Sequence, residues 1–167
     1  MDRCHSIALR LTGNPHDAEE ITQDALVRAY RALATYDAER IAALRIRGWL
    51  ATIVLNLCRN RARRGAPPST PLAPLLDAGG EPRAGEASDP AAIALRHADR
   101  ASLAAHLAAL PERYRVPVVL RHVDDLSYAE LAAVLGRPEG TLKAQVHRGL
   151  ALLRTAMEHP ELEELSA

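Results

Sequence analysis

Four side chains between residues 141 and 148 could bind DNA. Thr141, Lys143, His147 and Arg148 supply a hydroxyl, an ammonium, an imidazole and a guanidinium group. Apolar residues recur between them at the spacing of one helix face, and these inward positions are Leu142, Val146, Leu150 and Leu153. An arginine can donate two hydrogen bonds to a guanine edge, and a lysine can reach a base or a phosphate. The spacing therefore predicts a helix with a polar, DNA-facing side.

The residues before this helix predict a short helix and a tight corner. Ser127 and Glu130 have the spacing of a capping box, and the inward face would be Leu131, Val134 and Leu135. Gly136 can end the helix in a left-handed conformation, and Pro138 can open the next helix. Two helices joined in this way form a helix-turn-helix. The spacing alone leaves open an ordinary helical hairpin whose basic residues are only solvated.

The composition favours an all-α protein. Of the 167 residues, 48% are hydrophobic and none is Phe, which suits helices packed through small side chains. The chain has neither an apolar run of membrane-spanning length nor a convincing signal peptide. Cys4 and Cys58 suggest neither a disulfide framework nor a zinc site, so we expect a cytoplasmic protein. The histidines lack metal-ligand spacing, and we expect no cofactor and no enzymatic activity.

The net charge of zero conceals two basic segments. Residues 1–64 contain 11 arginines against 7 acidic residues, and residues 101–154 contain 7 basic against 5 acidic residues. The stretch between them and the C-terminal residues are acidic. Local charge, rather than the total, determines attraction to phosphates, so the balance does not exclude a nucleic-acid partner.

The sequence divides into two helical modules. Residues 65–90 are rich in Pro, Gly and Ala and read as a flexible linker between modules at 1–64 and 91–155, with an acidic tail at 156–167. In the first module we expect helices over residues 4–12, from Asn14 or Asp17 to 34, and over 48–63, with irregular structure from 36 to 47. In the second module, Asp89 and Pro90 can open a helix, and Pro117 must bend the following one or mark its late start.

Two surfaces of the first module invite a functional interpretation. The helix from about residue 15 buries a stripe comprising Ile21, Ala25, Ala29 and Leu33, widened by Leu26 and Tyr30. Its other face carries Glu20, Gln23 and Asp24, either for a partner or simply as a solvated surface. The last helix ends in Arg59, Arg61, Arg63 and Arg64, which suit the helix dipole but exceed what capping needs. Phosphate binding is therefore favoured there.

Three segments in order resemble a known family. They are ALRLTGNPHDAEEITQDALVRAYRAL, WLATIVLNLCRNRARR and LPERYRVPVVLRHVDDLSYAELAAVLGRPEGTLKAQVHR. Together they resemble bacterial RNA polymerase sigma factors of the extracytoplasmic-function (ECF) group. The resemblance implies a two-module protein that binds core RNA polymerase and directs promoter-specific initiation, with the first module at the −10 element and the second at −35.

The resemblance implies roles for individual residues. Glu20, Gln23 and Asp24 match the face that docks on the clamp helices of the β′ subunit, and the β flap is a further expected contact. For −10 DNA, Tyr36 matches an aromatic position that captures a flipped base, and Asn56 matches a residue near the melted strand; the basic residues expected there are Arg59, Arg61 and Arg63. Trp49 is expected to lie in the core. An anti-sigma factor is a further partner that the family implies.

For −35 DNA, the resemblance implies contacts from the start of the recognition helix. Pro138, Gly140 and Thr141 match positions that hold a phosphate, and Lys143, His147 and Arg148 match positions that reach the bases. Ala144–Gln145 and Leu150 replace groups that are often polar or basic in the family, so the grip on DNA is expected to be weaker.

The first module also departs from the family. The stretch from Tyr36 to Trp49 is longer than usual, and the usual helix before ALRLTG is missing, so either the start lies further upstream or a packing element is lost. The alternative to a sigma factor is a stand-alone helix-turn-helix regulator that does not engage polymerase.

Overall fold

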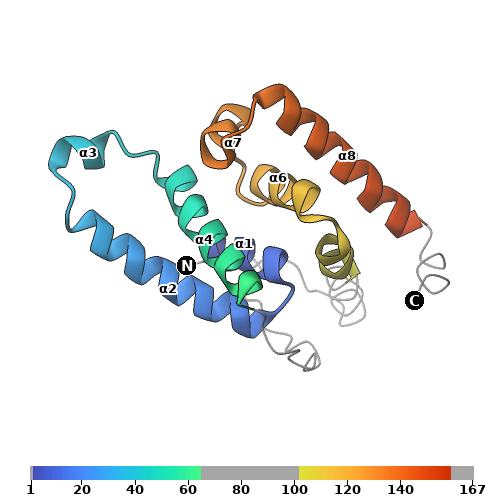
Figure 1. Ribbon diagram of the computed structural model, residues 1–167, viewed down its shortest axis with the longest axis horizontal. Helices are drawn as coiled ribbons and strands as arrows, with labels where there is room; N and C mark the ends of the chain where they lie inside the picture. Colours follow the sequence, from blue (N-terminus) through green and yellow to red (C-terminus); the bar gives the residue numbers. More distant parts are fainter. Residues whose placement is uncertain (1, 65–101, 159–167) are drawn as a thin grey trace, which may run out of the picture.

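The computed structural model describes residues 2–64 and 102–158, and all regular structure in these two ranges is helical, as predicted. The first range contains α1 (Asp2–Thr12), α2 (Pro15–Leu33), α3 (Ala38–Ala42) and α4 (Ile46–Arg63). The second contains a helical segment at 102–109, then α6 (Glu112–His122), α7 (Tyr128–Leu135) and α8 (Glu139–Glu158) (Figure 1). The predicted linker and the helix start at Asp89–Pro90 lie outside the described residues. No helix in the described part is long and apolar enough to cross a membrane.

The first module is a packed group of α1, α2 and α4. Gly13, at φ +69°, ends α1, and the Asn14 side chain then caps α2 by accepting from the backbone N–H groups of His16 and Asp17. The predicted stripe of α2 is confirmed at its centre, where Ile21 and Ala25 are buried. Tyr30 was wrongly placed in that stripe, since 77% of it is exposed.

The segment predicted to be irregular contains a helix. The Asp37 side chain caps α3 by accepting a hydrogen bond from the backbone N–H of Arg40. This local bond defines where α3 begins, although the segment has no apolar pattern that would predict a helix. None of the residues of α3 is buried, and α3 lies at the end of the first module farthest from the second module (Figure 1). The connection from α2 to α4 is therefore partly helical, and this helix is not buried.

Pro117 neither ends α6 nor delays its start. The helix begins at Glu112 and continues through Pro117 to His122. Residues 116–120 are all buried, because α6 packs against both α8 and α1. A helix that is covered on two sides does not show a single apolar stripe in its sequence.

The helix-turn-helix is confirmed. Ser127 and Glu130 form the reciprocal capping box, and Gly136 closes α7 at φ +64°. The inward face of α8 was predicted wrongly at one position, because Leu150 is 38% exposed and Gly149 is buried instead. At 100° per residue, Gly149 lies about 20° from Leu142 around the helix, whereas Leu150 lies about 80° away. Helix α8 also runs to Glu158, beyond the predicted boundary at 155.

Ser127→Ala is expected to lower the free energy of unfolding by about 1 kcal/mol at neutral pH, because α7 loses its cap. Hydrogen bonds from the Ser127 hydroxyl and backbone N–H lower the pKa of Glu130. A carboxyl with a lowered pKa stabilises the fold above its unfolded pKa and loses that contribution as the pH falls. Urea unfolding should therefore show the difference between wild type and Ser127→Ala narrowing in acid. An unchanged difference would contradict this role for the capping box.

Candidate nucleic-acid interface

The outward face of α8 is open and polar. Thr141, Lys143, His147 and Arg148 are all exposed, as are Pro138 and Gly140 at the start of the helix. The Lys143 ammonium lies 3.8 Å from the Glu139 carboxylate and 5.5 Å from the centre of the Tyr128 ring. The structure thus brings together all six residues predicted at the −35 element on the first two to three turns of α8.

Two contacts that the sequence analysis missed hold this helix in place. The Arg137 guanidinium donates a hydrogen bond to the Gln145 amide oxygen at 3.2 Å, which ties the corner of the helix-turn-helix to α8. Gln145 therefore supports the corner of the helix-turn-helix. Gly149 lets α6 approach, since a Cβ there would lie 2.7 Å from a Val118 methyl carbon.

The aromatic pair of the first module lies beside α3. The ring centres of Tyr36 and Trp49 are 6.2 Å apart at 57°, and the Arg40 guanidinium stacks 3.9 Å from the centre of the Tyr36 ring. Both aromatic residues are half-buried, so Trp49 is only partly in the core. A base that stacks on the face of Tyr36 covered by Arg40 must first displace that guanidinium.

The structure does not gather the predicted −10 residues into one open patch. Asn56 and Arg63 are exposed on α4, but Arg59 forms an ion pair with Glu112 at 3.1 Å. Arg61 forms ion pairs with Asp17 and Glu20, the latter at 2.9 Å. Arg61 therefore joins α4 to α2.

The acidic face of α2 is larger than predicted. Glu20 is half exposed, and Gln23 and Asp24 are exposed. Val27 and Tyr30 continue the same line of the helix and are 48% and 77% exposed. We call these five residues the α2 ridge. Val27 follows Gln23 by four residues and Asp24 by three, and Tyr30 follows Val27 by three; this spacing could have revealed the apolar extension.

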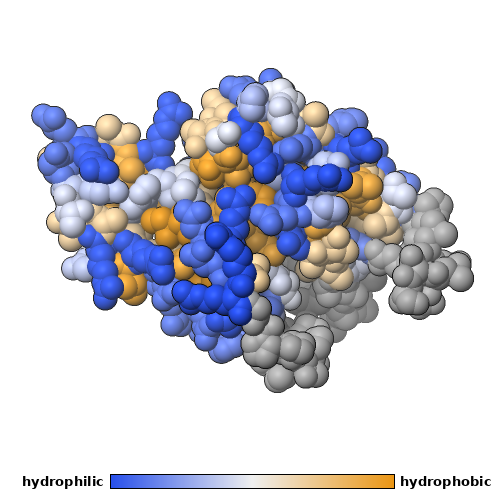
Figure 2. Space-filling view, viewed as in Figure 1, coloured by the Kyte–Doolittle hydropathy of each residue, from blue (hydrophilic) through white to orange (hydrophobic). Residues whose placement is uncertain are grey.

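Within residues 2–64 and 102–158, no group of three His, Cys, Asp or Glu side chains could hold a metal ion. Burial raises the pKa of Cys4, and it raises the pKa of Cys58 to about 12, so both thiols stay protonated at neutral pH. Polar side chains dominate the face seen in Figure 2, where apolar atoms show in the band between α4 and α7.

Both modules match known families. Residues 1–66 match the Sigma-70 region 2 family, and residues 100–153 match Sigma-70, region 4. The chain is 36% identical over 155 residues to the ECF RNA polymerase sigma factor SigE of Mycolicibacterium smegmatis, covering 92% of this chain and 56% of that protein. It is 30% identical to the ECF sigma factor SigW of Bacillus subtilis, covering 92% of this chain and 82% of SigW.

Solved structures share the fold. The sigma factor RpoE of Bartonella quintana, in complex with the anti-sigma factor NepR, aligns with a TM-score of 0.68 at 20% identity, over 93% of this chain and 89% of RpoE. CnrH, in complex with the cytosolic domain of CnrY, aligns at 0.61 with 25% identity, over 93% of this chain and 80% of CnrH. The chain therefore belongs to the ECF group of RNA polymerase sigma factors.

Proposed function

We propose that this chain, a sigma factor of transcription initiation, binds core RNA polymerase through the α2 ridge and −35 DNA through α8. The observation that carries this proposal is the exposure of both surfaces, one on each module. The α2 ridge combines carboxylates with the exposed Val27 and Tyr30. This mixture of apolar and charged groups suits a protein partner, because an apolar centre with a polar rim is the usual anatomy of such interfaces.

On the DNA side, we assign base reading to Lys143, His147 and Arg148. Pro138, Gly140 and Thr141 lie at the start of α8, where a helix N-terminus can bind a phosphate. The −10 roles of Tyr36 and Asn56, and of the basic residues Arg59, Arg61 and Arg63, remain proposals. Arg59 and Arg61 would first have to leave their carboxylate partners.

Three further statements belong to this proposal. We also propose domain boundaries at residues 64 and 91, with a linker between them and a tail at 156–167; the family matches over 1–66 and 100–153 support a division of the chain in this region. Promoter opening would draw on binding energy while polymerase performs the chemistry, so the chain itself would catalyse no reaction. We also propose that it works in the cytoplasm. CnrH binds the cytosolic domain of CnrY, and we extend the expectation of an anti-sigma partner to this chain. The β flap is the expected polymerase contact of the second module.

Asp24→Lys is expected to weaken association with core polymerase by about tenfold, because it reverses a charge at the centre of the α2 ridge. Co-purification of the chain with purified core enzyme measures this. Glu39→Lys provides the matched control, because it makes the same charge change on exposed α3, outside the ridge. Circular dichroism should show both variants folded.

The same experiment separates the sigma factor from a stand-alone helix-turn-helix regulator. If the wild-type chain fails to co-purify with core enzyme, the regulator becomes the better description. If Asp24→Lys and Glu39→Lys bind equally well, the ridge is not the docking face.

A further inference from the structure

Arg61 bridges two carboxylates where α4 packs against α2. One terminal nitrogen of its guanidinium pairs with Asp17, and the other pairs with Glu20 at 2.9 Å. Asp17 and Glu20 lie three residues apart on α2, so their side chains share one side of that helix. A planar guanidinium presents its donors at fixed angles, which an ammonium group cannot do. Arg61 therefore fixes the position of one carboxylate relative to the other.

The two carboxylates differ in exposure. The Asp17 side chain is only 10% exposed, whereas 49% of the Glu20 side chain is exposed. A buried carboxylate that loses its partner is costly, so the pair with Asp17 anchors the guanidinium of Arg61. The anchored guanidinium then holds Glu20 at the surface, within the α2 ridge.

Glu20 is also restrained from its own helix. The His16 Nε2 lies 3.4 Å from the Glu20 Oε1, one turn earlier on α2, while Arg61 holds the Glu20 Oε2. An exposed glutamate otherwise samples several rotamers, and fixing such a side chain on binding costs affinity. A carboxylate has about four lone-pair sites, so Glu20 can still accept hydrogen bonds from a partner. Glu20 is therefore ordered before any partner binds.

The same contacts make Arg61 a poor cation for DNA. Its one positive charge faces the two negative charges of Asp17 and Glu20, which leaves a net negative site. A DNA phosphate that approached Arg61 would be repelled by both carboxylates. Arg61 is therefore better suited to ordering the α2 ridge than to binding the −10 element.

We propose that Arg61 is a positioning residue for polymerase binding: it holds Glu20 in the orientation in which the α2 ridge docks. The inference deepens the proposed function and rests on it, because it assumes that the ridge is the docking face. It replaces the −10 role of Arg61. Ordering Glu20 in the free chain raises affinity, because the cost of fixing its rotamer falls on folding rather than on binding.

Arg61→Lys tests the proposal in the full-length chain. The lysine keeps a positive charge for the buried Asp17, but its ammonium is a point charge and cannot hold both carboxylates in the same geometry. Titration of the fluorescently labelled chain with purified core RNA polymerase should show association weakened by about three- to tenfold. In a Glu20→Ala background the same exchange should cause no further loss, because the residue through which Arg61 acts is gone.

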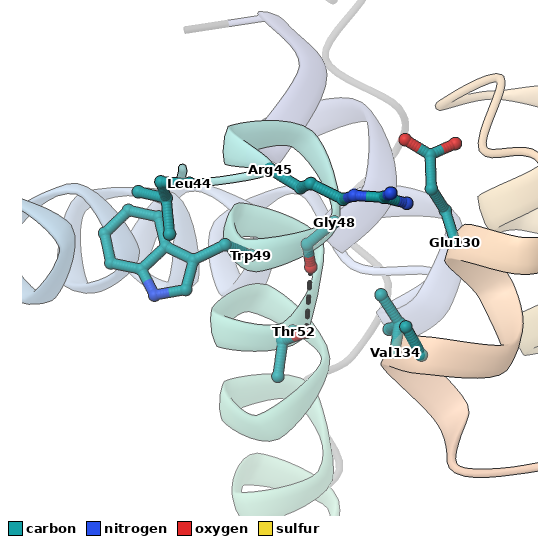
Figure 3. A pocket seen from close by; sticks show the side chains of 8 residues that line it. Leu44, Arg45, Gly48, Trp49, Thr52, Glu130 and Val134 are labelled. Atoms are coloured by element: carbon teal, nitrogen blue, oxygen red, sulfur yellow. Dashed lines mark hydrogen bonds between the residues drawn. The ribbon is translucent and has the colours of Figure 1, made fainter. Parts of the chain in front are cut away.

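Arg45→Lys is the matched control for the exchange itself. Arg45 is exposed at the opposite end of α4, 16 residues before Arg61 and about 24 Å away along the helix. Its side chain points toward Glu130 at the edge of a hollow of about 210 Å³ between α4 and α7 (Figure 3). Arg45→Lys should bind core polymerase as tightly as the wild type does. Urea unfolding should show both lysine variants folded.

A DNA assay separates positioning from contact with the −10 element. With core enzyme saturated, Arg61→Gln and the wild type should bind a promoter fragment that the wild type transcribes with the same dependence on salt. Loss of a phosphate contact would instead reduce the slope of log affinity against log salt by about 0.7–0.9. Such a reduction would place Arg61 on the DNA and overturn the proposal.

The outcomes of the polymerase titration are also distinct. If Arg61→Lys binds core enzyme as tightly as the wild type, Arg61 does not position the ridge. Equal losses in the wild-type and Glu20→Ala backgrounds would overturn the proposal as well, because Arg61 would then act through the fold rather than through Glu20. If Glu20→Ala and Asp24→Lys both bind as the wild type does, the ridge is not the docking face. The proposed function then fails, and the positioning role fails with it.

Discussion

Gly149→Val is expected to destabilise the second module and abolish binding to −35 DNA. A Cβ at residue 149 would lie 2.7 Å from a Val118 methyl carbon and 3.3 Å from the Tyr114 Cβ, so α6 and α8 must move apart. Overpacking of this kind costs about 1–3 kcal/mol, against which the better helix propensity of Val returns only a few tenths. Movement of α8 would also shift the whole DNA-facing side. Urea unfolding and a DNA-binding titration measure the two effects.

Gly140→Val is the control for stability. Gly140 lies near the start of the same helix, and a Cβ there would meet no atom within 4 Å. The substitution should leave the free energy of unfolding within about 0.5 kcal/mol of the wild type, as is usual for an exposed site. Equal unfolding curves for the Gly149 and Gly140 variants would refute the close packing of α6 on α8.

Arg148→Ala is expected to weaken promoter binding by about 1–3 kcal/mol, roughly tenfold to a hundredfold, if its guanidinium reads a base. Arg148 is exposed and lies about 20° from Thr141 around α8, two turns after it. Because its side chain is exposed, its removal should leave the stability of the fold unchanged. The affinity of the holoenzyme for a promoter fragment should fall, and discrimination at one base pair of the −35 element should relax.

Arg154→Ala is the matched control for this effect. Arg154 is also exposed on α8, but it lies six residues later, about 9 Å further along the helix axis from the start of α8, where the proposed DNA contacts lie. Its loss should change promoter affinity little and sequence preference not at all. If both variants lose affinity equally for every sequence, Arg148 acts only through general attraction to phosphates.

The sequence predicts those elements of the fold whose signals are local. The corner of the helix-turn-helix follows from Ser127, Glu130 and Gly136, because a capping box and a left-handed glycine need no distant partner. For the same reason the start of α2 was narrowed to Asn14–Pro15 or Asp17, and the structure has the cap at Asn14. The outward side chains of α8 were identified because one buried stripe fixes the opposite face.

Properties that depend on a distant partner were missed. Nothing near Gly149 in sequence indicates that Val118 will approach it, so Leu150 was taken for the inward residue. The sequence did not reveal that Arg61, a proposed −10 contact, pairs with Asp17, 44 positions away. It also gave no sign that Arg3 would bind Asp124, 121 positions away. Contacts between modules are set by tertiary packing, which a single sequence does not encode at any fixed spacing.

The most direct test of the central claim is run-off transcription on a library of promoter fragments with core RNA polymerase and this chain. The account predicts that addition of the chain directs initiation to a distinct subset of fragments that share two separated sequence elements. Arg148→Ala should reduce transcription from that subset. Transcription that is identical with and without the chain, although the chain binds core enzyme, would contradict its role as a promoter-specific sigma factor.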